Sequence, residues 1–189
     1  KKFKFFYNKI WKKFKLKYLK IVMKEVIIFT DGSSLNNQQK GKRKGGVGVF
    51  FGNDDPRNIS FPLKESKYFK VTNQVAELTA CVKGIETLIG TEKVMAKQIV
   101  IYTDSMYIVN SISSWAKNWA KNDWKKSNGK RVENLNLIRK LYYYCLNLGI
   151  ILRHVKAHRD PPPKDSKEYP IWFGNDQADK LAVAGAKKG

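Results

Sequence analysis

The chain has 189 residues and a net charge of +21, from 37 Lys and Arg against 16 Asp and Glu. Its 42% hydrophobic content excludes a wholly disordered protein, and its two cysteines, Cys81 and Cys145, exclude a disulfide scaffold. No apolar run approaches the ~18–20 residues that cross a bilayer, and the charge indicates an anionic partner, either nucleic acid or an acidic membrane surface.

The first 24 residues carry ten of the positive charges, all from lysine, and no acid. Their apolar residues recur every three or four positions from Phe3 to Ile21, which predicts a cationic amphipathic helix. This N-terminal extension could lie on anionic lipid or on nucleic acid. The alternatives are that Met23 is the natural start, so that the extension has no role, and that compositional drift accounts for part of the lysine content. Residues 25–189 are expected to form one domain.

In chain order, the hydrophobic pattern predicts strands over residues 25–30, 45–51 and 58–63, a helix over 73–90, a strand over 98–103, helices over 105–124 and 135–148, a strand over 150–155 and a helix over 175–187. Turn and cap signals predict a turn at 31–33, a hairpin turn at 53–56, an N-cap at Thr72 or Asn73, a C-cap at Gly90 and a long loop over 159–173. This order predicts a mixed sheet, in which three antiparallel strands precede two parallel ones.

Two predicted strands end in similar sequences, Thr30-Asp31-Gly32-Ser33 and Thr103-Asp104-Ser105. Because ligand sites gather at the carboxyl ends of strands in open α/β sheets, we expect Asp31 and Asp104 to lie close together. Adjacent carboxylates repel each other unless a divalent metal ion neutralises them. Glu77, early in the helix over 73–90, and Asp179, beside small residues of the last helix, also lie next to a packed helix face.

Five sequence elements resemble type 1 ribonuclease H, the cellular-type enzyme, and occur in that family's order: TDGS, TNQVAELTA, YTDS, HVKAH and GNDQADKLA. The resemblance covers residues 25–187 and implies the ribonuclease H-like fold, an α/β fold with a five-stranded mixed sheet flanked by helices. It implies an endonuclease that hydrolyses the RNA strand of RNA–DNA hybrids and leaves 5′-phosphate and 3′-hydroxyl ends. Cleavage is expected to be largely independent of base sequence, because phosphate contacts position a duplex without reading its bases.

The family's metal-binding acids correspond to Asp31, Glu77, Asp104 and Asp179. Oxygen ligands without His or Cys favour a hard cation, Mg²⁺ or Mn²⁺. The resemblance implies two ions about 3.5–4 Å apart that hold the scissile phosphate between them. Asp31 is expected to bridge the two ions, because it lies on the central strand.

The catalytic-loop histidine of the family corresponds to His158, which suits a proton shuttle or an aid to product release. Asp176 corresponds to an auxiliary acid, and we interpret His154 as structural. Two departures bear on His158. Ala157 stands where the family often has Gly, and the loop over 159–173 is longer than in compact members, so that it could reposition His158 or gate product release.

Substrate contacts carry over from the family as well. Asn73, Gln74 and Asn37 (or Asn36) match positions that contact the RNA strand, where they could read the 2′-OH. Lys70, Thr72 and Asn134 match a pocket for a DNA phosphate, with Lys70 where Arg can stand. Residues 107–130 resemble a basic protrusion that follows the DNA strand, with its candidate contacts at Tyr107, Trp115, Trp119, Lys121, Lys125 and Lys126. Among the aromatic residues, we expect Tyr107 and Trp115 to face the DNA, and Trp119 and Trp124 to pack the helices together.

Two alternatives stay open: a non-catalytic hybrid-binding module, and the ribonuclease H domain of a reverse transcriptase or other retroelement. The presence of all four acids disfavours the first, and the basic stretch and the lack of a polymerase segment disfavour the second. We further expect an intracellular monomer, in the cytoplasm or nucleus, because the sequence shows no secretory signal.

Overall fold

The computed structural model describes residues 25–35, 43–65, 70–91 and 98–189. The predicted amphipathic helix of residues 1–24, and the candidate RNA contacts Asn36 and Asn37, lie outside the described residues. Within the described ranges, no helix is long and apolar enough to span a membrane.

The five strands form one mixed sheet: β1 (Glu25–Leu35), β2 (Lys44–Phe50), β3 (Ile59–Lys64), β4 (Gln98–Thr103) and β5 (Ile151–His154). Their order across the sheet is β3-β2-β1-β4-β5, so that β1 is the central strand. β1, β2 and β3 pair antiparallel, whereas β4 pairs in parallel with both β1 and β5. The predicted arrangement of three antiparallel strands followed by two parallel ones is therefore confirmed.

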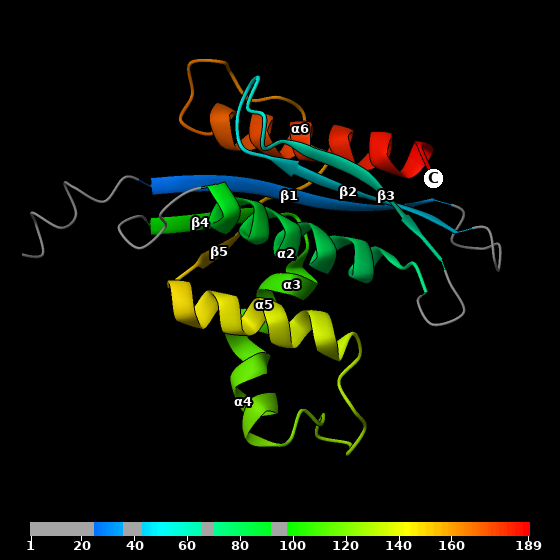
Figure 1. Ribbon diagram of the computed structural model, residues 1–189. Coiled ribbons are helices and arrows are strands. Elements are labelled where there is room, and N and C mark those ends of the chain that lie inside the picture. The colour runs from blue at the N-terminus through cyan, green and yellow to red at the C-terminus, as the bar shows by residue number, and fades with distance from the viewer. Residues whose placement is uncertain (1–24, 36–42, 66–69, 92–97) are drawn as a thin grey trace, which may run out of the picture.

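Helices cover both faces of this sheet (Figure 1). α6 (Tyr169–Lys187) lies along one face, and α2 (Asn73–Thr91) lies on the other, with α5 (Leu135–Leu148) packed against it. The segment after β4 forms α3 (Met106–Asn110), the π-helical turn η2 (Ser111–Trp115) and α4 (Ala116–Lys121), and α4 points away from the sheet.

Side chains that alternate along β1 separate two hydrophobic cores. Ile28 belongs to the larger core between the sheet and α2, which α5 closes with the fully buried Ile138 and Leu141. Phe29 belongs to the smaller core under α6, where its ring stacks on Tyr102 with centroids 5.2 Å apart. The central strand is thus fixed from both faces, which gives the residues that follow Phe29 a rigid support.

The predicted turn at residues 31–33 is wrong, because β1 continues to Leu35 and pairs with β2 as far as Lys44. The glycine at position 32 is required by the close packing of α2 and not by a turn. A Cβ at Gly32 would collide with the backbone of Ala76 and Glu77 in α2, so only glycine allows that helix to approach the strand. Asp31 therefore lies within the central strand and not after its end.

Three helix boundaries also differ from prediction. The expected single helix over 105–124 is interrupted by η2 and ends at Lys121, because Asp123 and Trp124 take positive φ angles of 49° and 56°. Gly90 lies inside α2 and not at its C-cap. α6 begins at Tyr169, within the expected loop, with Pro170 in the first turn, where a missing N–H loses no helical hydrogen bond.

Candidate active site

Three carboxylates from three elements converge beside the middle of the central strand, level with the carboxyl end of β4. Asp31 lies on β1, Glu77 in the second turn of α2, and Asp104 directly after β4. One carboxylate oxygen from each lies within 4.8 Å of the other two. The parallel pairing of β1 with β4, from Glu25↔Gln98 onward, carries Asp31 and Asp104 to the same end of the sheet, as the sequence predicted.

The fourth predicted acid, Asp179, comes from α6 on the opposite face. It is not part of the close trio, but it lies near enough to Asp31 that its carboxyl group raises the pKa of Asp31. α6 can lie this near because β2 has glycines below it: a Cβ at Gly46 or Gly48 would collide with the backbone of α6. All four predicted acids are thus brought to one place.

The cluster is costly to ionise when no cation is present. Asp31 is 6% exposed and Glu77 is 8% exposed. Burial, with the neighbouring charges of Asp104 and Asp179, raises the pKa of Asp31 to about 7. Burial, with the charges of Asp31 and Asp104, raises the pKa of Glu77 to about 10. Since an ionised carboxylate is disfavoured at both positions, the metal-free cluster retains protons at neutral pH.

These residues fit a divalent metal ion. One carboxylate oxygen of Glu77, Oε2, is buried and has no hydrogen-bond partner within the described part of the chain. A buried acceptor without a partner is rare, and a cation would satisfy it. The donors of the trio are all carboxylate oxygens, which suit a hard cation such as Mg²⁺.

Both histidines lie near Asp104. His158 is exposed and lines a pocket together with Asp104, Asp176 and Asp179. Burial raises the pKa of Asp104, while the backbone N–H of Asp104 and the charge of His158 act against that rise. Nε2 of His154 lies 3.1 Å from the backbone oxygen of Asp104.

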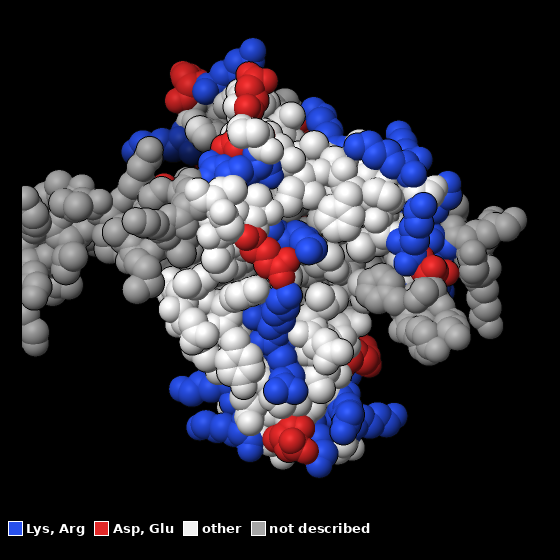
Figure 2. All heavy atoms as spheres, viewed as in Figure 1, with Lys and Arg blue, Asp and Glu red and all other residues white. Residues whose placement is uncertain are grey.

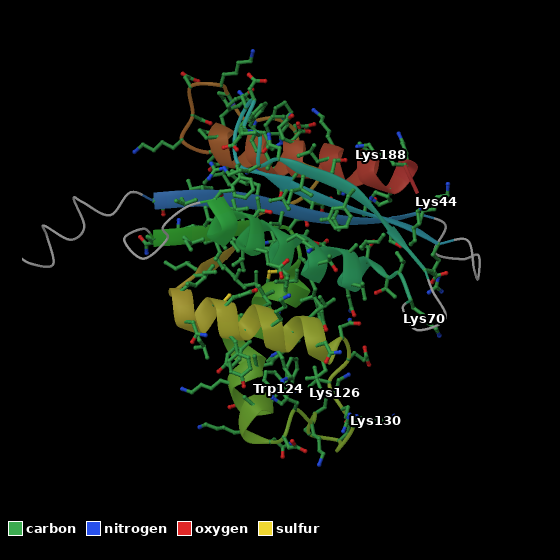
Figure 3. The ribbon with its side chains drawn as sticks, viewed as in Figure 1. Lys44, Lys70, Trp124, Lys126, Lys130 and Lys188 are labelled. Carbon is green, nitrogen blue, oxygen red and sulfur yellow. The ribbon has the colours of Figure 1, made fainter. Side chains whose placement is uncertain are left out.

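The predicted substrate contacts at the start of α2 are accessible. Asn73 and Gln74 are exposed, and Thr72 is the N-cap of α2, because its Oγ1 accepts a hydrogen bond from Val75 N (3.2 Å). Asn134, the N-cap residue of α5, donates from Nδ2 to Oε1 of Gln74 (3.5 Å). This contact brings the predicted RNA and DNA positions side by side, and Figure 3 shows Lys70 just before α2.

The segment around α4 carries an aromatic surface pocket. Trp115 is 42% exposed, and its ring centroid lies 5.6 Å from that of the half-buried Trp119. Three polar residues that were not predicted as contacts complete the pocket lining: Asn118, Asn122 and Ser127. The spacing of Asn118 and Asn122 from Trp115 matches one helix face and could have found them, whereas Ser127 lies in a loop that carries no such signal.

The other two aromatic residues of this segment are less accessible. Trp124 is buried in the larger core, as predicted, and Tyr107 is half-buried against the same core. Figure 2 shows basic side chains gathered at the lower end of the molecule, where Figure 1 places α4 and the loop after it. The three predicted basic contacts lie in this region: Lys121 and Lys125 are exposed, and Lys126 forms an ion pair with Glu133 (3.0 Å).

Residues 23–187 match the family described as RNase H. The Ribonuclease H of Schizosaccharomyces pombe is 40% identical over 162 residues, which cover 86% of this chain and 53% of that protein. The Ribonuclease H of Rickettsia massiliae is 34% identical over 161 residues, which cover 85% of this chain and 90% of that protein. The chain spans about half the length of the first curated relatives it matches.

Two solved structures have the same fold at lower identity. LC9-RNase H1, described as a type 1 RNase H with the type 2 active-site motif, aligns with a TM-score of 0.65 and 24% identity over 88% of this chain and 74% of that one. The foamy viral protease-reverse transcriptase in complex with RNA/DNA hybrid aligns with a TM-score of 0.66 and 19% identity over 89% of this chain and 21% of that one. At these identities the likeness shows the fold alone.

Proposed function

Because the chain belongs to the ribonuclease H family, we propose that it is a ribonuclease H, an endonuclease that hydrolyses the RNA strand of RNA–DNA hybrids. The observation that carries this proposal is the convergence of Asp31, Glu77 and Asp104 in one cluster, with Asp179 near enough to raise the pKa of Asp31. A non-catalytic hybrid-binding module would gain nothing from this cluster, because burying carboxylates together costs stability. Relatives at 34–40% identity are named Ribonuclease H, whereas the likeness to a reverse transcriptase shows only the fold, so we favour the first class.

We propose that the four acids bind two Mg²⁺ ions, for which Mn²⁺ can substitute. Asp31 is the natural shared ligand, because it lies on the central strand with Asp104 and Asp179 as its charged neighbours. Bound there, the ions would supply an activated water and a stabilised leaving oxygen, so that cleavage leaves a 5′-phosphate and a 3′-hydroxyl.

The remaining site residues have roles that fit their surroundings. His158 borders the pocket that holds Asp104 and Asp179, so it is placed to accept or donate a proton beside the acids and to assist product departure. Asp176, in the same pocket, forms an ion pair with Lys180 (2.7 Å), which fits an auxiliary acid that is held in place.

The hybrid is proposed to lie across the starts of α2 and α5. The exposed amides of Asn73 and Gln74 can donate to and accept from a ribose 2′-OH, the group that distinguishes RNA from DNA. The hydroxyl oxygen of Thr72 accepts from Val75 N–H, which leaves its own hydrogen free to donate to a DNA phosphate beside Lys70. The solved foamy viral relative of the fold is itself bound to an RNA/DNA hybrid.

The DNA strand is proposed to continue toward the pocket around Trp115. Its aromatic face and the exposed Lys121 and Lys125 suit stacking against sugars or bases and attraction to phosphates. We propose that the protein acts as a monomer, and that residues 1–24 add a sequence-independent contact to anionic nucleic acid or lipid. Comparing residues 23–189 with the full chain in hybrid-binding and vesicle-binding assays tests the second point.

The decisive assay incubates an RNA–DNA hybrid, duplex DNA and duplex RNA with the protein and Mg²⁺. We expect cleavage of the RNA strand of the hybrid alone, with end analysis that gives 5′-phosphates. Asp31→Asn and Asp104→Asn should abolish cleavage and, by calorimetry, weaken Mg²⁺ binding. Asp123→Asn, which changes an exposed acid after α4, is the matched control and should leave both unchanged. Persistent cleavage by Asp104→Asn would contradict the assignment of the metal ligands.

A further inference from the structure

The connection between β5 and α6 runs as a long loop beside the first turn of α6 (Figure 1). This segment follows Val155, contains His158, and has three successive prolines at 161–163. It forms its own turns, because Ser166 N donates to Pro163 O (2.9 Å) and Tyr169 N donates to Ser166 O (3.2 Å). The loop is therefore internally ordered where it leads into α6.

His158 has a backbone conformation that needs support. Its φ of 49° lies in the left-handed region, which is strained for a residue with a Cβ and persists only when neighbouring contacts fix it. The next residue, Arg159, supplies two such contacts. Its carbonyl oxygen accepts a hydrogen bond from Nε1 of Trp172 (3.0 Å), and its Nη1 donates to Oε2 of Glu168 (3.0 Å).

Trp172 is itself held rigidly. It lies in the first turn of α6, where its backbone N–H donates to Glu168 O (3.0 Å) and its ring packs on Tyr169 with centroids 5.7 Å apart. The following residue, Phe173, meets the Phe50 ring edge-on at 6.0 Å in the smaller core. Trp172 also lines the pocket that His158 shares with Asp104 and Asp179. A hydrogen bond from Trp172 thus connects the histidine loop to the same helix that carries Asp179.

We propose that Trp172 is a positioning residue, whose indole N–H holds the Arg159 carbonyl so that His158 stays beside the acid cluster. This inference rests on the proposed function, and it makes the long loop a brace for His158 instead of a gate. The Arg159–Glu168 ion pair contributes less, because the Glu168 side chain is 67% exposed and exposed pairs add little.

The test uses Trp172→Phe, which keeps an aromatic ring in the pocket but removes the N–H donor together with part of the indole. We expect kcat to fall by about three- to tenfold, the range that corresponds to one lost hydrogen bond, while the dissociation constants for hybrid and Mg²⁺ stay unchanged. Tyr169→Phe, which removes the hydroxyl group of the adjacent ring and keeps the Trp172 donor, is the matched control and should leave kcat unchanged. Glu168→Gln should lower kcat by less than about twofold.

A double-mutant comparison separates positioning from general stabilisation. In a His158→Ala background, Trp172→Phe should have no further effect on kcat, because the residue acts only through the histidine. An equal loss in both backgrounds, or no loss in either, would overturn the proposal.

NMR spectra of the metal-free protein supply a readout that does not depend on cleavage. Trp172→Phe should shift or broaden the backbone amide signal of His158, and Tyr169→Phe should not. If the wild-type protein cleaves no hybrid, the proposed function fails while these spectra still test the brace. An unchanged His158 signal in Trp172→Phe would refute the brace even in an active enzyme.

Discussion

Replacing Glu77 with Gln should stabilise the metal-free protein at neutral pH. Burial and the charges of Asp31 and Asp104 raise the pKa of Glu77 to about 10, against 4.5 for an ordinary glutamate. Between these two values the folded state keeps a proton that the unfolded state releases. The free energy of unfolding therefore falls as pH rises through this window, and Gln at position 77 removes that contribution because it cannot ionise.

The size of this effect follows from the number of protons involved. One proton held fully in the folded state and released in the unfolded state changes the free energy of unfolding by about 1.4 kcal/mol per pH unit. From pH 5 to pH 7 the Glu77 contribution is then at most about 3 kcal/mol. A divalent cation that binds the ionised carboxylates of the folded state alone should also raise the free energy of unfolding at neutral pH, as the substitution does.

The assay is urea unfolding at pH 5, 6 and 7, in EDTA and in Mg²⁺. The wild type in EDTA should lose stability as pH rises, whereas Glu77→Gln in EDTA and the wild type in Mg²⁺ should lose less. Glu86→Gln is the matched control on the same helix. Partial burial raises the pKa of Glu86, but hydrogen bonds from Lys140 and Lys83 outweigh burial and lower that pKa below its ordinary value. Its replacement should therefore reduce stability above pH 5. Equal slopes for wild type and Glu77→Gln in EDTA would refute the reasoning.

Three further predictions concern packing and binding. Gly48→Ala should cost about 1–3 kcal/mol in thermal unfolding, because its Cβ would collide with Ala178 O, whereas Gly52→Ala, with open space around it, should be neutral; equal losses would contradict this packing. Trp115→Ala should weaken hybrid binding by about 1–3 kcal/mol in fluorescence anisotropy. Trp124→Ala should instead reduce the free energy of unfolding by about 3–5 kcal/mol. The reverse pattern would mean that Trp124 contacts the hybrid and Trp115 supports the core. Lys125→Gln should reduce the slope of log affinity against log salt by about 1, and an unchanged slope would place this lysine outside the interface.

Local sequence signals predicted the strands well, because the runs around Ile28 and Ile99 are apolar and β-branched wherever the sheet is buried on both faces. They failed at Gly32, where glycine serves a close helix contact and not a turn. No local pattern separates these two uses of glycine, because the contact with α2 is made by residues more than 40 positions away. The interruption of the helix after β4 at η2 was missed for a similar reason, since its apolar spacing is compatible with a continuous helix.

The acids were easier to predict than their surroundings. Asp31 and Asp104 follow from the parallel pairing of two strands, which the element order already implied. The brace on His158 could not be predicted, because the Trp172 to Arg159 hydrogen bond joins residues across a loop that has no repeating pattern. The prolines of that loop led to the prediction of an irregular segment as far as Phe173, although α6 begins at Tyr169.

The position of Asp179 depends on how closely α6 approaches the sheet. Gly48 is the register partner of Asp31 across β1 and β2, and it is also the point where the backbone of α6 passes at Ala178, the residue before Asp179. A side chain at position 48 must therefore push α6 outward at the place where Asp179 meets Asp31. For this reason Gly48→Ala should weaken Mg²⁺ binding as well as stability, whereas a core substitution remote from α6, such as Ile138→Val, should reduce stability alone. If both variants lost stability and neither lost Mg²⁺ affinity, the approach of α6 would not set the geometry of the acids.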